Sequence, residues 1–167
     1  MAKGAGGCLN REPLRAPEGI AGGAAAMDPT PGRLLAQKVL AYDPRADAGV
    51  IERAYVMAAE AHAPQKRENG DPYIGHPLAV AEILAGYRLD SGTIITALLH
   101  DVVEDTPIGL DVLEKRFGKE VARLVDGVTK LTRLELQSER TKQAENFRKL
   151  VLAMSEDIRV LLVKLAD

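Results

Sequence analysis

From Arg33 onward, apolar residues recur at helical spacing along almost the whole chain. The stretches 33–41 and 47–62 place apolar side chains three or four residues apart, which is the period of one face of an α-helix. The loop 63–75 is rich in proline and glycine and interrupts this pattern. The pattern then predicts further helices at 77–88, 93–105, 110–117, 119–132, 138–155 and 157–166. Because no segment alternates with a period of two, we expect an all-α protein, a compact helical bundle.

Residues 1–32 differ in composition from the rest of the chain. They are rich in Gly, Ala and Pro, and their larger apolar side chains, such as Leu14 and Ile20, are isolated. Such a stretch buries too little apolar surface to offset the entropy lost on ordering. We therefore expect a disordered tail over 1–32 and one domain over 33–167. Met27 is a second candidate for the initiator methionine.

Composition and charge narrow the class of protein. The chain has 22 Lys+Arg against 24 Asp+Glu, and this balance argues against binding to nucleic acid or a membrane through the overall field. Its single cysteine, Cys8, excludes an intramolecular disulfide. No apolar run reaches the roughly 18 residues of a membrane span, and no apolar segment resembling a secretory signal follows Lys3. We therefore expect a cytoplasmic protein.

The segment 93–105 (TIITALLHDVVED) contains the main candidates for chemistry. On one continuous helix, His100 and Glu104 would share a face with Asp101 and Asp105, because residues four apart are neighbours. A solvated polar face at the end of an amphipathic helix is the simpler interpretation of this stripe.

Two observations favour a bound cation over a solvated face. The segment from Leu89 to Glu114 contains six acidic residues and neither Lys nor Arg. The helix predicted within it is apolar around most of its circumference, which indicates burial. Carboxylates beside a histidine on a buried helix repel one another unless a cation lies among them.

The remaining histidines and the final aspartate give weaker signals. His76 precedes Pro77 at a predicted helix start and would be the N-cap. The helix dipole there disfavours the imidazolium and favours the neutral ring that binds metals; a simple capping role is the alternative. His62 ends a helix, where a protonated histidine is favoured, and we interpret it as structural. Asp167 follows an apolar run, and alone it means little.

The order of these residues resembles that of the HD-domain phosphohydrolases, which is H…HD…D. Here it is formed by His76, the pair His100-Asp101, and Asp167. The resemblance is closer to the N-terminal hydrolase domain of the RelA/SpoT family, which makes and degrades guanosine tetra- and pentaphosphate, (p)ppGpp. It covers roughly Leu35 to Asp167. The blocks that carry it are 62–77, 98–106, 127–131 and 143–167.

The resemblance implies an all-helical domain that holds one Mn²⁺. The implied ligands are His76, His100, Asp101 and Asp167. Imidazole and carboxylate donors suit Mn²⁺, although this ligand set alone leaves Zn²⁺ and Fe²⁺ open. The implied reaction removes the 3′-pyrophosphate of (p)ppGpp and gives GDP or GTP and diphosphate.

The resemblance also implies roles for residues near these ligands. Glu104 would orient or deprotonate the attacking water, and Asp105 would assist proton transfer. In the loop 63–75, Arg67 and Tyr73 would meet the nucleotide. Some family members carry a basic residue where this chain has Glu68, so we expect weaker affinity or altered selectivity.

The family continues beyond the position of Asp167 with further helices, a synthetase domain and regulatory domains. We therefore expect this chain to be the N-terminal piece of a bifunctional enzyme. Because Asp167 would lie at an unsupported helix end, where fraying is expected, we expect weak hydrolysis or none from the chain alone. Two alternatives stay open: an HD phosphohydrolase for another nucleotide, and a catalytically silent module that binds nucleotide and regulates.

Overall fold

The computed structural model describes residues 30–136 and 157–167. This part of the chain is helical, with one isolated antiparallel bridge between Lys66 and Pro72 and no strand within the described ranges. The all-α prediction is therefore confirmed. Of the tail predicted over 1–32, residues 1–29 lie outside the described residues, as does the helix predicted over 138–155, whereas Pro31 and Gly32 belong to a helix and correct the predicted boundary. The helices are α1 (Pro31–Leu40), α2 (Ala48–Ala61), α3 (Gly75–Gly86), α4 (Ser91–Leu99), α5 (Val102–Asp105), α6 (Leu110–Phe117), α7 (Lys119–Leu136) and α9 (Ile158–Ala166).

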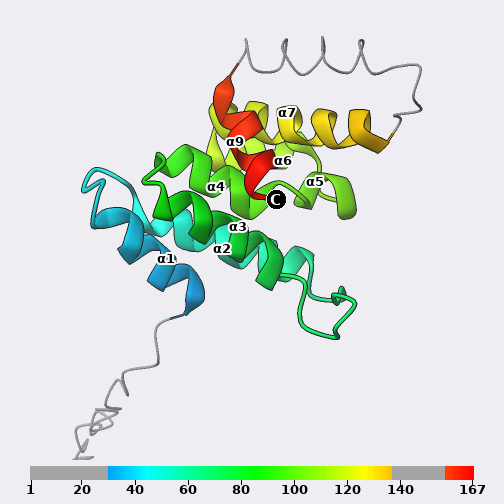
Figure 1. The fold of residues 1–167 in the computed structure, drawn as a ribbon, viewed down its shortest axis with the longest axis horizontal. Helices are drawn as coiled ribbons and strands as arrows, with labels where there is room; N and C mark the ends of the chain where they lie inside the picture. The colour runs from blue at the N-terminus through cyan, green and yellow to red at the C-terminus, as the bar shows by residue number, and fades with distance from the viewer. Residues whose placement is uncertain (1–29, 137–156) are drawn as a thin grey trace, which may run out of the picture.

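Helix α4 is the centre of the bundle. It packs against α2, α3, α7 and α9, and Figure 1 shows it in the middle of the assembly. Every side chain from Thr93 to Leu99 is buried, as expected of a helix that is apolar all round. Among the described helices, none has both the length and the apolarity needed to cross a bilayer.

The predicted single helix 93–105 is wrong, because the chain breaks between α4 and α5. His100 and Asp101 lie at this junction. The imidazole Nδ1 of His100 lies 2.7 Å from the carbonyl oxygen of Ala97, which is the acceptor that a continuous helix offers to the amide of residue 101. A side chain that competes for a backbone acceptor interrupts a helix. The break places His100, which is buried, and Asp101, which is partly buried, at a helix junction rather than within a stripe.

Two predicted helix starts are also corrected. Helix α1 begins at Pro31, because Thr30 caps it by accepting a hydrogen bond from the amide of Arg33 at 3.3 Å. Helix α3 begins at Gly75 with Ile74 as its N-cap. His76 is therefore a residue of the first turn, and its predicted role as the N-cap is wrong.

Helix α9 approaches α7 closely at Gly127. A Cβ atom at this glycine would lie 2.8 Å from Cγ2 of Val160, a buried residue of α9. Such a distance is far inside van der Waals contact, so the absence of a side chain at Gly127 lets the two helices meet. The position of α9 matters because this helix ends at Asp167.

We expect Gly127→Ala to destabilise the protein by about 1–3 kcal/mol, the usual cost of overpacking a close contact. The matched control is Gly86→Ala in α3, where an added Cβ has no neighbour within 4 Å. There, the reduced freedom of the unfolded chain is expected to stabilise by about 0.5 kcal/mol. Urea denaturation of both variants measures the difference, and equal unfolding free energies would contradict this account of the α7–α9 contact.

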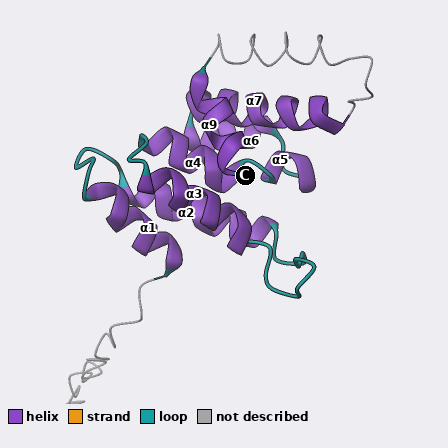
Figure 2. Cartoon of the chain, viewed as in Figure 1, coloured by secondary structure: helices purple, strands orange, loops and turns teal. Residues whose placement is uncertain are grey.

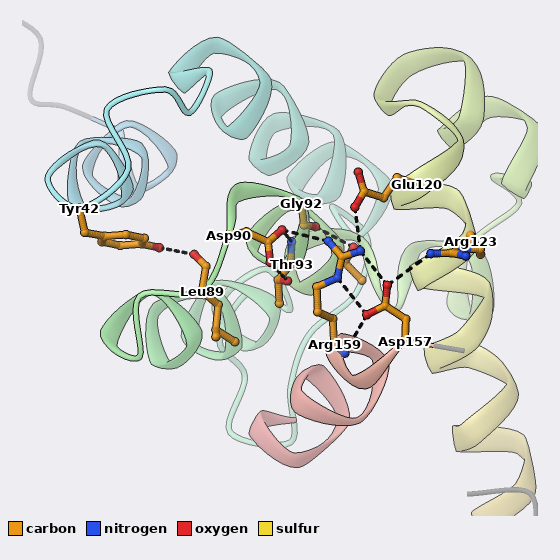
Figure 3. Close-up of polar contacts among 10 residues, drawn as sticks. Tyr42, Leu89, Asp90, Gly92, Thr93, Glu120, Arg123, Asp157 and Arg159 are labelled. Atoms are coloured by element: carbon orange, nitrogen blue, oxygen red, sulfur yellow. Dashed lines mark hydrogen bonds and ion pairs between the residues drawn. The ribbon is translucent and has the colours of Figure 1, made fainter. Parts of the chain in front are cut away.

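The start of α9 is tied to two other helices by ion pairs around Arg159 (Figure 3). Its guanidinium lies 2.7 Å from Asp157, 2.7 Å from Glu120 of α7 and 3.1 Å from Asp90, the N-cap of α4. Arg123 of α7 also pairs with Asp157 at 3.3 Å. The hydrogen bonds from Arg159 lower the pKa of Asp157 to about 2. Asp157 therefore stays ionised well below neutral pH, and the network fixes the start of α9 against α4 and α7.

Candidate metal centre

Three separate parts of the fold bring four polar side chains together. His76 comes from the first turn of α3, His100 and Asp101 from the α4–α5 junction, and Asp167 from the end of α9. Nε2 of His76 lies 2.8 Å from Oδ1 of Asp167, and Nε2 of His100 lies 3.4 Å from the same oxygen. Oδ1 of Asp101 lies 3.1 Å from Nε2 of His100, and Oδ2 lies 3.7 Å from Nε2 of His76.

Three of the four residues expected to hold a metal come together at one point, and Asp101 lies beside both histidines. The ligand atoms that His76, His100 and Asp167 can offer all lie within 4.8 Å of one another. The two imidazole rings are 5.5 Å apart between centroids. This spacing fits a single cation coordinated by two imidazoles and carboxylates.

The chemistry of His100 tests whether a cation suits this point. Its Nδ1 must carry a proton, because the carbonyl oxygen of Ala97 can only accept. In the neutral ring, Nε2 then carries a lone pair. This nitrogen is buried and has no hydrogen-bond partner, and it faces the carboxylates of Asp101 and Asp167. A buried lone pair beside two carboxylates is unfavourable unless a positive charge, from a cation or from a proton on Nε2, lies between them. The residues present therefore fit a cation.

The same electrostatics act on the titrating groups. Burial lowers the pKa of His100, but the carboxylates of Asp167 and Asp101 outweigh burial and raise it overall. The neighbouring imidazoles of His100 and His76 hold the pKa of Asp167 well below its usual range. The second oxygen of Asp167, Oδ2, accepts a hydrogen bond from Lys164 at 2.8 Å. Asp167 therefore stays ionised, with Oδ1 directed at the two histidines.

Tyr73 lies beside this cluster. Its hydroxyl donates a hydrogen bond to Oδ2 of Asp101 at 2.7 Å and lies 3.4 Å from Oδ2 of Asp105. Burial and these hydrogen bonds raise the pKa of Tyr73 well above its usual range, so its hydroxyl remains a donor. Its contact with the nucleotide stays a prediction.

Glu104 and Asp105 are the last two of the four residues of helix α5, one turn beyond the His100-Asp101 junction. Burial raises the pKa of Glu104, and the nearby charges of Asp105 and Asp101 raise it further. A carboxylate with a raised pKa is a better proton acceptor near neutral pH. This environment supports the catalytic role predicted for Glu104.

The basic residues expected to meet a nucleotide lie on the exposed loop between α2 and α3, drawn as a long teal segment in Figure 2. The amide of Arg67 donates to the carbonyl of Asp71 at 2.9 Å. Gly70, at φ +88°, closes this turn, a conformation that glycine adopts without strain. Arg67 and Glu68 are both exposed, and their contacts with a ligand stay predictions.

Two further residues at the base of this loop contact the cluster indirectly. His62 is buried, and its Nδ1 lies 2.8 Å from Oε1 of Gln65. The side-chain amide nitrogen of Gln65 donates a hydrogen bond to the backbone carbonyl oxygen of Asp105 at 3.0 Å. The burial of His62 agrees with its interpretation as structural. The sequence analysis missed Gln65, and its spacing of three residues from His62 was the available signal.

Comparison with known proteins identifies the family. A family model described as an HD domain matches residues 54–167, which is more than half of the chain. The chain therefore belongs to the HD-domain family, whose members depend on a divalent metal.

Individual relatives identify a narrower family within the HD-domain proteins. The chain is 51% identical over 133 residues to the GTP pyrophosphokinase rsh of Brucella ovis, covering 80% of this chain and 18% of the relative. It is 50% identical, again over 133 residues and 80% of the chain, to the bifunctional (p)ppGpp synthase/hydrolase SpoT of Escherichia coli K12, covering 19% of that protein. The resemblance to the RelA/SpoT family is thus confirmed, over less than a fifth of these relatives' length.

A solved structure supports the same relationship. It is described as a metazoan ortholog of SpoT that hydrolyzes ppGpp and plays a role in starvation responses. The match has a TM-score of 0.53 and 31% identity, and it covers 72% of this chain and 66% of that one.

Proposed function

We propose that this chain is a Mn²⁺-dependent hydrolase domain that removes the 3′-pyrophosphate of (p)ppGpp. One observation carries the proposal: His76, His100, Asp101 and Asp167 converge beside Glu104 and Asp105. This convergence occurs in an HD domain that is 50% identical, over 133 residues, to SpoT of Escherichia coli K12. The products are GDP or GTP and diphosphate.

The two imidazoles and two carboxylates would hold the cation. Nitrogen and oxygen donors together suit Mn²⁺ among the divalent metals. When bound, the cation supplies Lewis acidity, which lowers the pKa of water and offsets negative charge on the phosphoryl group. Lys164 keeps Oδ2 of Asp167 engaged and leaves Oδ1 to the cation.

Glu104 and Asp105 of α5 carry out the proton transfer. Glu104 accepts a proton from the attacking water at a carboxylate oxygen, and the water oxygen forms the new bond to phosphorus. The bond between that phosphorus and the ribose 3′ oxygen breaks, the 3′ oxygen takes up a proton, and diphosphate leaves. Asp105 assists this transfer. Arg67, on the exposed loop, binds the guanine nucleotide, and the neighbouring Glu68 weakens that binding.

The wider context forms part of the proposal. The chain acts as the hydrolase part of a longer bifunctional cytoplasmic enzyme, since SpoT of Escherichia coli is named for both synthesis and hydrolysis. Its partners are guanosine tetra- and pentaphosphate rather than nucleic acid or a membrane, consistent with its nearly balanced charge.

The test is a single-turnover assay with the chain in excess over ppGpp, so that even slow hydrolysis is measured. With Mn²⁺ we expect release of GDP and diphosphate, its loss on adding EDTA, and its return with fresh Mn²⁺. Faster hydrolysis of a deoxynucleoside triphosphate or a cyclic nucleotide would assign another substrate. Binding of ppGpp without turnover of any of these compounds would instead indicate a silent regulatory module.

A further inference from the structure

The orientation of the Asp101 carboxylate is not set by the helix on which it lies. Asp101 is the N-cap of α5, a position where an aspartate side chain usually accepts a hydrogen bond from a backbone amide. Here it makes no such bond. Its Oδ1 instead lies 3.1 Å from Nε2 of His100. Another group must therefore hold the carboxylate in this orientation.

Tyr73 supplies the contact that fixes this carboxylate. Its hydroxyl donates to Oδ2 of Asp101 at 2.7 Å, and Oδ1 is left directed at His100. A hydrogen bond to one carboxylate oxygen restricts rotation of the whole group, and it leaves the other oxygen free for a cation.

The Tyr73 ring is itself held in place by its neighbour His62. It stacks on the buried ring of His62, with centroids 4.7 Å apart. Because the amide nitrogen of Gln65 donates to the carbonyl oxygen of Asp105, its Oε1 accepts from Nδ1 of His62. The end of α2, the loop and the end of α5 are thereby joined around Tyr73. The hydroxyl is held in place before any ligand arrives.

We propose that Tyr73 is a positioning residue for the metal centre, whose hydroxyl holds Oδ2 of Asp101 so that Oδ1 stays directed at Nε2 of His100. This inference rests on the metal-dependent function proposed above. It differs from the role that the sequence resemblance implies for Tyr73, which is contact with the nucleotide. A positioning role acts on the affinity for the cation, whereas a nucleotide contact acts on the affinity for the substrate.

Tyr73→Phe tests the inference, because it removes the hydroxyl and keeps the ring stacked on His62. We expect the Mn²⁺ affinity of the chain, measured by titration calorimetry without substrate, to fall at least about tenfold, as for other residues that orient metal ligands. The matched control is Tyr42→Phe. The Tyr42 hydroxyl donates to the carbonyl oxygen of Leu89, also at 2.7 Å, on another part of the fold (Figure 3). The control is expected to keep wild-type Mn²⁺ affinity.

The outcomes separate this inference from the proposed function. Equal Mn²⁺ affinity in Tyr73→Phe and the wild-type chain overturns the positioning role but leaves the proposed function standing. A raised KM for ppGpp with unchanged Mn²⁺ affinity also overturns it and assigns Tyr73 to the substrate. If the wild-type chain binds no Mn²⁺ at all, the metal centre of the proposed function fails, and the positioning role fails with it.

Discussion

Replacing His100 with alanine is expected to weaken Mn²⁺ binding more than about 100-fold and to abolish hydrolysis of ppGpp. The reason lies in the geometry of the ring. Its Nδ1 is fixed by the carbonyl oxygen of Ala97, so the only free nitrogen faces the carboxylates of Asp101 and Asp167. Loss of a direct ligand exceeds the 10- to 100-fold effects of residues that merely orient ligands. Titration calorimetry with Mn²⁺ measures the change.

The control for His100→Ala is His62→Ala. Both histidines are 2% exposed, so both substitutions empty a similar buried volume and are expected to cost similar stability. His62 is not an expected ligand but packs on the ring of Tyr73, so its replacement is expected to weaken Mn²⁺ binding by about tenfold at most, well short of the loss in His100→Ala. Wild-type affinity in His100→Ala would show that the cation binds elsewhere. Equal losses in the two variants would attribute the effect to folding rather than to coordination.

The paired substitution Glu104→Gln with Asp105→Asn is expected to lower turnover of ppGpp by about 10³-fold, within the range that general acid–base groups contribute. The amides keep the size of the carboxylates but accept no proton from water. We expect Mn²⁺ affinity to stay within a few-fold of wild type, because neither residue belongs to the four converging side chains. Single-turnover release of diphosphate and calorimetry on the same sample give both quantities.

The control for this pair is Asp111→Asn with Glu114→Gln on α6. It makes the same change in net charge at two exposed positions and is expected to leave turnover unchanged. Retained turnover in the α5 variant would exclude Glu104 and Asp105 as the proton-transfer groups. A loss of Mn²⁺ binding in that variant would instead assign the pair to the ion.

The apolar pattern predicted the helices well, because burial of an apolar face is what makes these helices fold. It failed at the α4–α5 junction, where the ring of His100 contacts the Ala97 carbonyl. Hydrophobic periodicity carries no information about such a contact between a side chain and the backbone. The start of α3 was misplaced for a similar reason. Turn hydrogen bonds from Gly75 to Pro72 and from His76 to Tyr73 lead directly into that helix.

Only part of the candidate site could be predicted from the sequence. The spacing of His100, Asp101, Glu104 and Asp105 alone fitted a solvated face; the absence of Lys and Arg from Leu89 to Glu114 and the apolar character of the helix favoured a cation site. Asp167 carried no local signal, because its place beside His76 depends on how α9 packs against α3 and α4. Only the family resemblance included it. The hydrogen bond from Tyr73 to Asp101 depends on the path of a loop, which no periodicity describes.

The attachment of α9 at both ends has a thermodynamic consequence. Arg159 joins its start to α4 and α7, and Asp167 at its end faces the two histidines. Ion binding and docking of this helix therefore share one equilibrium, and each favours the other by the same factor. At the proposed metal centre, an empty site would loosen the helix that carries the expected ligand Asp167, so occupancy of the centre and protection of the α9 amides from hydrogen exchange are expected to rise and fall together.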